Sequence, residues 1–131
     1  MKDPLKVIIF SAILLFTIGL VGCQSVPIKN VEHATVIIGD QVSLVDIKNA
    51  INLAGAGLGW QMKETEPGVI TGTLYLRKHM AKVKIPYSKT EYSIIYQDSY
   101  ELNYDGTNIH KAYNGWIQNL DREIRTRLSL L

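Results

Sequence analysis

Three histidines, His33, His79 and His110, are residues whose type could support metal binding. Metal-binding histidines that share one helix are spaced closely, as in His-x-x-x-His, so that both rings reach one ion. These three lie far apart in the sequence and show no such spacing. We therefore predict no metal site. Nothing else in the sequence indicates a cofactor.

Asp98, Ser99 and His110 are the residue types of a nucleophilic hydrolase. Such an enzyme needs a serine whose hydroxyl is held by a histidine, which an acid orients. No strained strand-to-helix motif surrounds Ser99, and Asp-Ser at a strand end is typical of a turn. A hydrolase is therefore the third of three functional hypotheses. Glu64 and Glu66 lie two apart on a predicted strand without an apolar pocket, which indicates an exposed edge.

Gly55, Gly57 and Gly59 superficially resemble a nucleotide-binding loop. A dinucleotide-binding loop follows a strand and opens a helix. Here the hydrophobic pattern predicts a helix before the glycines and a strand after them. We therefore interpret the glycines as the end of that helix.

The N-terminal segment has Lys2 and Lys6 before an apolar run from Val7 to Val21. A charged start, a short apolar stretch and small residues before a break are typical of a secretory signal. An uncleaved membrane anchor or an ordinary signal peptide is the alternative. The run is short for a span, which needs about 17 to 25 apolar residues.

Leu20-Val21-Gly22-Cys23 resembles the lipobox of bacterial lipoproteins. The resemblance implies cleavage before Cys23, diacylglycerol on its sulfur and a fatty acyl chain (palmitate) on its new amino group. It also implies a location: an aspartate after the cysteine signals retention in the inner membrane, whereas this chain has Gln24. We expect the periplasmic face of the outer membrane, and the inner membrane as the less favoured site.

Removal of residues 1–22 would leave 109 residues, which is one small domain. The net charge of +2 falls to +1 when Lys2, Lys6 and Asp3 are removed. A nucleic-acid partner would call for a dense basic stripe. We therefore predict no nucleic-acid partner.

We divide the chain into a lipoprotein signal peptide (1–22), a lipidated tether (23–41) and a single α+β domain (42–131). The tether lacks a sustained period and contains Pro27 and Gly39. A short edge strand over 36–38 is an open alternative. A helix begins after Ser43, which forms a weak capping box with Asp46. Its apolar face is spaced at three and four residues: Ile47, Ala50, Ile51, Ala54 and Leu58.

Alternating apolar and polar residues predict four strands, over 60–66, 70–76, 81–87 and 92–98. A four-residue turn would pair Leu76 with Ala81, and Tyr87 would pair with Tyr92. An odd number of residues must join the first two strands if Trp60 is to share the apolar face. Residues 100–104 are interpreted as a short strand or an irregular crossover.

The last helix should begin after Thr107 or Asn108. Its apolar stripe comprises Ile109, Tyr113, Trp116, Ile117, Leu120, Ile124 and Leu128. The predicted fold is an α+β two-layer sandwich. A four-stranded antiparallel meander carries both helices on one face, in the order α-β-β-β-β-α.

Two surfaces are candidate binding regions. The sheet face opposite the helices should display Tyr75, Arg77, Lys82, Lys84 and Ile95. Tyr100 and Tyr104, beyond the regular strands, would line a groove for a glycan strand or a peptide. The sheet face would dock an anionic partner or lipid headgroups, and its alternative is a merely solvated surface. The alternative for the tyrosines is that they belong to the core and its hydrogen-bonded rim.

Three segments, 54–60, 92–99 and 109–120, resemble a family of small Gram-negative lipoproteins of uncharacterised function. The similarity spans most of residues 43–128. The family implies an envelope location and brings no assigned catalytic or binding residues.

We predict a non-enzymatic interaction or accessory module of the cell envelope. It would be held on the membrane by its lipid, with an envelope protein or peptidoglycan as partner. The second hypothesis is a small-ligand-binding lipoprotein with a pocket between sheet and helices.

Overall fold

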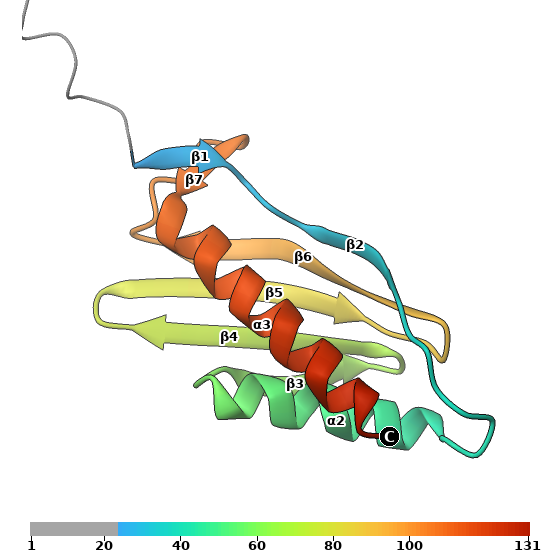
Figure 1. Cartoon of the computed structure of the whole chain (residues 1–131). Helices are drawn as coiled ribbons and strands as arrows, with labels where there is room; N and C mark the ends of the chain where they lie inside the picture. The colour runs from blue at the N-terminus through green and yellow to red at the C-terminus, as the bar shows by residue number, and fades with distance from the viewer. Residues whose placement is uncertain (1–23) are drawn as a thin grey trace, which may run out of the picture.

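Figure 1 shows the computed structural model, which describes residues 24–131. The predicted signal peptide and Cys23 lie outside the described residues. The strands are β1 (Ser25–Pro27), β2 (Val31–Thr35), β3 (Gln61–Glu66), β4 (Val69–Leu76), β5 (His79–Pro86), β6 (Glu91–Tyr100) and β7 (Asn108–His110). The helices are α2 (Leu44–Gly57) and α3 (Lys111–Ser129).

A five-stranded antiparallel sheet has the order β2-β6-β5-β4-β3, and β1 and β7 form a separate two-stranded sheet. The helix α3 crosses the larger sheet, and α2 lies beside β3 (Figure 1). The helix α2 contacts α3, β3 and β4. The α+β class and the meander β3 to β6 are confirmed. The structure has three further strands: β2 extends the meander's sheet, and β1 and β7 form the second sheet.

The predicted tether over 23–41 is wrong for residues 25–35, which belong to the folded domain. Strand β2 pairs with β6, where Val31 lies opposite Ile94 and Ala34 opposite Tyr92. The register shifts between Val31 and Ala34, where His33 has a φ of 53°. This irregularity breaks the period of two that would have marked the strand. The suggested strand over 36–38 lies just beyond the observed one.

The start of α2 confirms the capping box. The Asp46 N–H donates to Ser43 Oγ over 3.1 Å, and the Ser43 N–H donates to Asp46 Oδ2 over 2.8 Å. These hydrogen bonds lower the pKa of the Asp46 carboxyl, because they favour its charged form. The helix ends at Gly57, and Gly59 follows with a φ of 89°.

Gly55 is not at the helix end, as predicted, but is buried inside α2 against β3. A Cβ atom at this position would lie 2.7 Å from Met62 Cγ, 2.6 Å from the Met62 methyl group and closer still to the Met62 sulfur. A Cβ atom at Gly57, two residues later, would have no neighbour within 4 Å. Gly55 therefore allows the helix to approach the sheet closely.

Gly55→Ala is expected to lower the melting temperature, whereas Gly57→Ala should raise it. Overpacking against Met62 costs about 1 to 3 kcal/mol. The higher helix propensity of alanine returns about 1 kcal/mol at either position. Thermal unfolding of both variants measures the difference. Shifts in the same direction would show that Met62 moves aside without cost.

The helix α3 begins at Lys111, later than predicted. Neither Thr107 nor Asn108 caps it: His110 Nδ1 accepts the Ala112 N–H over 3.1 Å. Ile109 lies in β7 rather than on the helix. The rest of the predicted stripe is buried, except Trp116, which is partly buried beside the core. Its fully buried members are Tyr113, Ile117, Leu120 and Ile124.

The strand β4 joins β5 through a two-residue turn, so that Leu74, not Leu76, lies opposite Ala81. The predicted register between β4 and β5 is wrong by two residues. Because side chains alternate between the two faces of a sheet, a shift of two residues leaves the same face apolar. The pairing of Tyr87 with Tyr92 is confirmed. Trp60 can share the apolar face only if an extra residue interrupts the pairing of β3 with β4. A register shift between Glu64 and Glu66 supplies this residue. Glu64 and Glu66 therefore lie on opposite faces rather than on one.

The hydrophobic core draws its buried side chains from residues between Val31 and Leu128. Residues 24–131 thus contain a complete core and both sheets, which makes them one folding unit. Within this described part, neither helix is both long and apolar enough to cross a bilayer.

Candidate functional site

The sheet face opposite the helices, here called the outer face, carries a row of three side chains, two exposed tyrosines with a half-buried methionine between them. Tyr75 on β4 lies opposite Met80 on β5, and Met80 lies opposite Tyr100 on β6. Directly paired residues point to the same side of a sheet. The tyrosines are 63% and 62% exposed. This row is the most apolar part of the outer face.

Lysines occupy the rest of the outer face. Lys63 on β3 and Lys84 on β5 both lie opposite Thr71, one on each side of β4. Lys84 also lies opposite Ile95, as predicted for this face. Lys82 lies opposite Asp98, which offsets its charge. Lys63 and Lys84 form no ion pair within residues 24–131, and Glu66 on β3 is the acid that shares this face with Lys63.

One residue of the predicted interaction face and one of the predicted groove are placed differently. Arg77 is in the β4–β5 turn, with a φ of 56°, and not on the strand. Tyr100 was predicted only as a groove residue, but it lies on the outer face. A register shift between Lys82 and Val83 inserts an extra residue in β6 and changes which side chains point outward. No glycine or other sequence signal marks this bulge.

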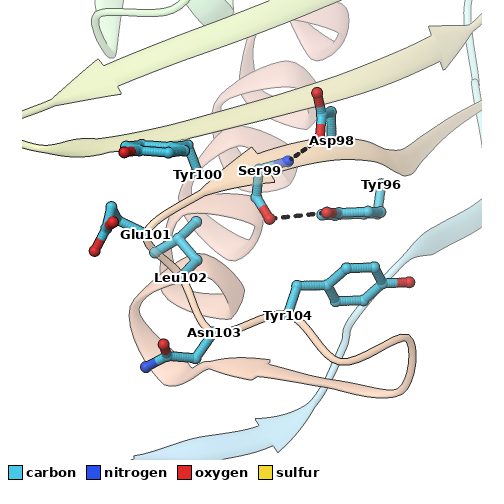
Figure 2. Close-up of a pocket in the computed structure, with 8 residues that line it drawn as sticks. All are labelled: Tyr96, Asp98, Ser99, Tyr100, Glu101, Leu102, Asn103 and Tyr104. Carbon is cyan, nitrogen blue, oxygen red and sulfur yellow. Dashed lines mark hydrogen bonds between the residues drawn. The ribbon is translucent and has the colours of Figure 1, made fainter.

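A cavity of about 400 Å³ lies at the end of β6, where Tyr100 and Tyr104 were expected to line a groove (Figure 2). Its lining combines the last residues of β6 with the loop that follows: Tyr96, Asp98, Ser99, Tyr100, Glu101, Leu102, Asn103 and Tyr104. Volumes of about 300 to 1,000 Å³ are typical of ligand pockets. The space between the sheet and the helices is instead filled by buried side chains.

Backbone strain is concentrated in the loop that lines the cavity. Glu101 and Asn103 have φ values of 57° and 53°, a left-handed conformation that is uncommon for residues other than glycine. His79 Nδ1 donates to the Glu101 carbonyl oxygen over 2.8 Å. The His110 N–H donates to the Leu102 carbonyl oxygen over 2.8 Å. These two contacts hold the loop in its strained form.

Three tyrosines pack together beside the cavity, and two of them, Tyr96 and Tyr104, line it. The Tyr96 ring lies 4.2 Å from the Tyr104 ring and 5.7 Å from the Tyr113 ring, between centroids. Burial raises the pKa of the Tyr96 hydroxyl and of the Tyr113 hydroxyl. The Tyr113 hydroxyl is buried and makes no hydrogen bond to the described residues. The Tyr96 and Tyr113 hydroxyls therefore stay protonated at neutral pH, and the cluster supplies aromatic rings beside the cavity.

The candidate hydrolase residues have other partners. Ser99 Oγ lies 2.8 Å from the Tyr96 hydroxyl, and the Ser99 N–H donates to Asp98 Oδ1 (Figure 2). His110 Nδ1 is engaged in capping α3. Among the described residues, no hydrogen bond joins Ser99 to His110. Glu64 pairs with Lys48 on α2 over 3.1 Å, and the hydrogen bond from Lys48 lowers the pKa of its carboxyl.

The structure brings together two histidines that the sequence left apart. The rings of His79 and His110 lie 6.5 Å apart, and His79 lies 6.3 Å from the ring of Trp116. His33 is distant from both and pairs with Glu91. Residues 24–131 hold no group of three or more potential metal ligands. The spacing in sequence gave no signal of the contact between His79 and His110.

Comparison with known proteins gives no match: no family model, curated protein or solved structure is significantly similar to this chain.

Proposed function

We propose that this protein is a lipid-anchored envelope lipoprotein whose domain acts without catalysis, as an interaction module on the periplasmic face of the outer membrane. The resemblance of Leu20-Val21-Gly22-Cys23 to a lipobox supports the anchor. Acylated Cys23 would carry diacylglycerol and a further acyl chain, and two or more chains give stable attachment. The envelope partner is another protein or peptidoglycan.

The observation that carries the interaction role is the composition of the outer face. No helix of the described chain covers it (Figure 1). It combines the row Tyr75, Met80 and Tyr100 with Lys63, Lys84 and Ile95. Contact surfaces are enriched in aromatic residues and methionine. Lys63 and Lys84, which form no ion pair within the described residues, favour a partner with negative charge.

Crosslinking in intact cells tests this role with the double reversal Lys63→Glu/Lys84→Glu. We expect the crosslinked partner to be lost, because both lysines are exposed and lie on the same face. Lys82 is left unchanged, since a carboxylate there would face Asp98. The melting temperature should stay within about a degree, as exposed substitutions change stability by less than about 0.5 kcal/mol. Unchanged crosslinks would reject the outer face as the binding surface.

The second candidate function is binding of a small ligand, glycan strand or peptide in the cavity at Tyr96–Tyr104. Its aromatic wall and strained loop support this alternative. Strained backbone is often kept where it shapes a binding site. If the crosslinks survive reversal of Lys63 and Lys84 but are lost in Tyr104→Ala, the cavity becomes the preferred site.

A further inference from the structure

The folded domain begins immediately after Cys23. The Gln24 carbonyl oxygen accepts the Lys111 N–H over 2.8 Å, and Ser25 already pairs with His110 in the β1–β7 sheet. One residue of extended chain spans about 3.5 Å. An anchor at Cys23 would therefore hold this end of the domain against the bilayer instead of on a long tether.

A continuous set of contacts defines this end of the molecule. Lys111 opens α3 next to His110, whose ring lies 6.5 Å from that of His79. His79 is the first residue after the β4–β5 turn, Arg77 and Lys78. In Figure 1 this turn and the start of β1 lie on the same side of the molecule. We call the surface formed by Arg77, Lys78, Lys111 and their exposed neighbours the anchor-end surface.

The anchor-end surface combines cations with exposed apolar side chains. Arg77, Lys78 and Lys111 are exposed, and Glu101 is the exposed acid beside them. Leu76 is 45% exposed, and the Tyr75, Met80 and Tyr100 row reaches the same end of the sheet. Tyrosine, arginine and lysine are the residues that prefer the interface between lipid and water.

We propose that the anchor-end surface docks on an anionic phospholipid bilayer, with Arg77, Lys78 and Lys111 at the lipid phosphates and Leu76 and Tyr100 in the interface. The orientation rests on the acylation of Cys23 proposed above. Electrostatic attraction acts over about 10 Å at 0.1 M salt, which a one-residue link does not exceed. The strands β4 and β5 then run away from the membrane, which places Lys63 and Lys84 farther from it than Arg77 and Lys78.

Vesicle binding by residues 24–131 tests the docking surface without the lipid anchor. These residues contain the whole core, so the domain is expected to fold alone. At low ionic strength it should bind vesicles of equal parts phosphatidylglycerol and phosphatidylcholine, and not phosphatidylcholine alone. Arg77→Glu/Lys78→Glu should lower the partition coefficient at least tenfold. Lys63→Glu/Lys84→Glu, with the same change in charge, should lower it less than twofold.

Lys111→Glu provides a second variant, since an acid in the first turn of α3 is compatible with the helix dipole. It should lower the partition coefficient at least threefold at an unchanged melting temperature. Equal losses in the two double variants would overturn the proposal, because they would indicate attraction by net charge alone. Absence of binding to the anionic vesicles would overturn it as well.

The full-length protein separates this proposal from the anchor itself. One outcome is that the full-length protein from cells floats with vesicles while the soluble domain variants Arg77→Glu/Lys78→Glu and Lys63→Glu/Lys84→Glu bind vesicles equally. This result would leave the lipid anchor in place and reject only the docking surface. If Cys23 carries no lipid but the soluble domain still binds anionic vesicles through Arg77 and Lys78, only the anchor is wrong.

Discussion

Ile124→Ala is expected to lower the free energy of unfolding by about 2 to 5 kcal/mol, the usual range for truncating a buried isoleucine. Ile124 is fully buried on the face of α3 that meets the sheet. The loss is a large part of the total stability of a small domain, about 5 to 15 kcal/mol. Urea unfolding of residues 24–131 measures it.

Ile37→Ala is the matched control, because the same atoms are removed from a side chain that is 86% exposed. It should change the free energy of unfolding by less than about 0.5 kcal/mol. If both substitutions cost the same, α3 does not pack on the sheet through Ile124.

Cys23→Ser should release the protein from the membrane fraction into the soluble periplasmic fraction. Each buried methylene of an acyl chain contributes about 0.8 kcal/mol to membrane attachment, so loss of all chains removes the main attraction. The anchor-end surface alone would leave a weak, salt-sensitive association. Fractionation of cells at low and high salt distinguishes the two contributions. A variant that stays in the membrane fraction at high salt would contradict the anchor.

The helices were largely predictable because their signals are local. Ser43 and Asp46 mark the start of α2, and the spacing of Ile47, Ile51 and Ala54 marks its buried face. The start of α3 was missed because a histidine acts as its cap. Neither Thr107 nor Asn108 begins the helix, because the Asp105 carboxylate accepts the N–H groups of both residues in a turn.

Strands formed with distant partners were less predictable. The strands β1 and β7 have three residues each, too few to show a period, and they pair across most of the described chain. The strand β2 contains a register shift at His33. Its pairing with β6 depends on tertiary contacts that the sequence pattern does not encode.

Only the part of the candidate site that depends on regular strand alternation was predictable from the sequence. Lys84 and Ile95 follow from simple alternation along the strands. Tyr100 reached the outer face only because of the extra residue in β6, and Met80 entered it because the β4–β5 turn is shorter than expected. The cavity also depends on positive φ values at Glu101 and Asn103, which no glycine announces.

Intact mass spectrometry of the protein extracted from cells in detergent tests the central claim most directly. The account predicts a polypeptide that begins at Cys23 and carries the mass of diacylglycerol and one further acyl chain. A polypeptide that begins at another residue, or one that begins at Cys23 without lipid, would contradict it.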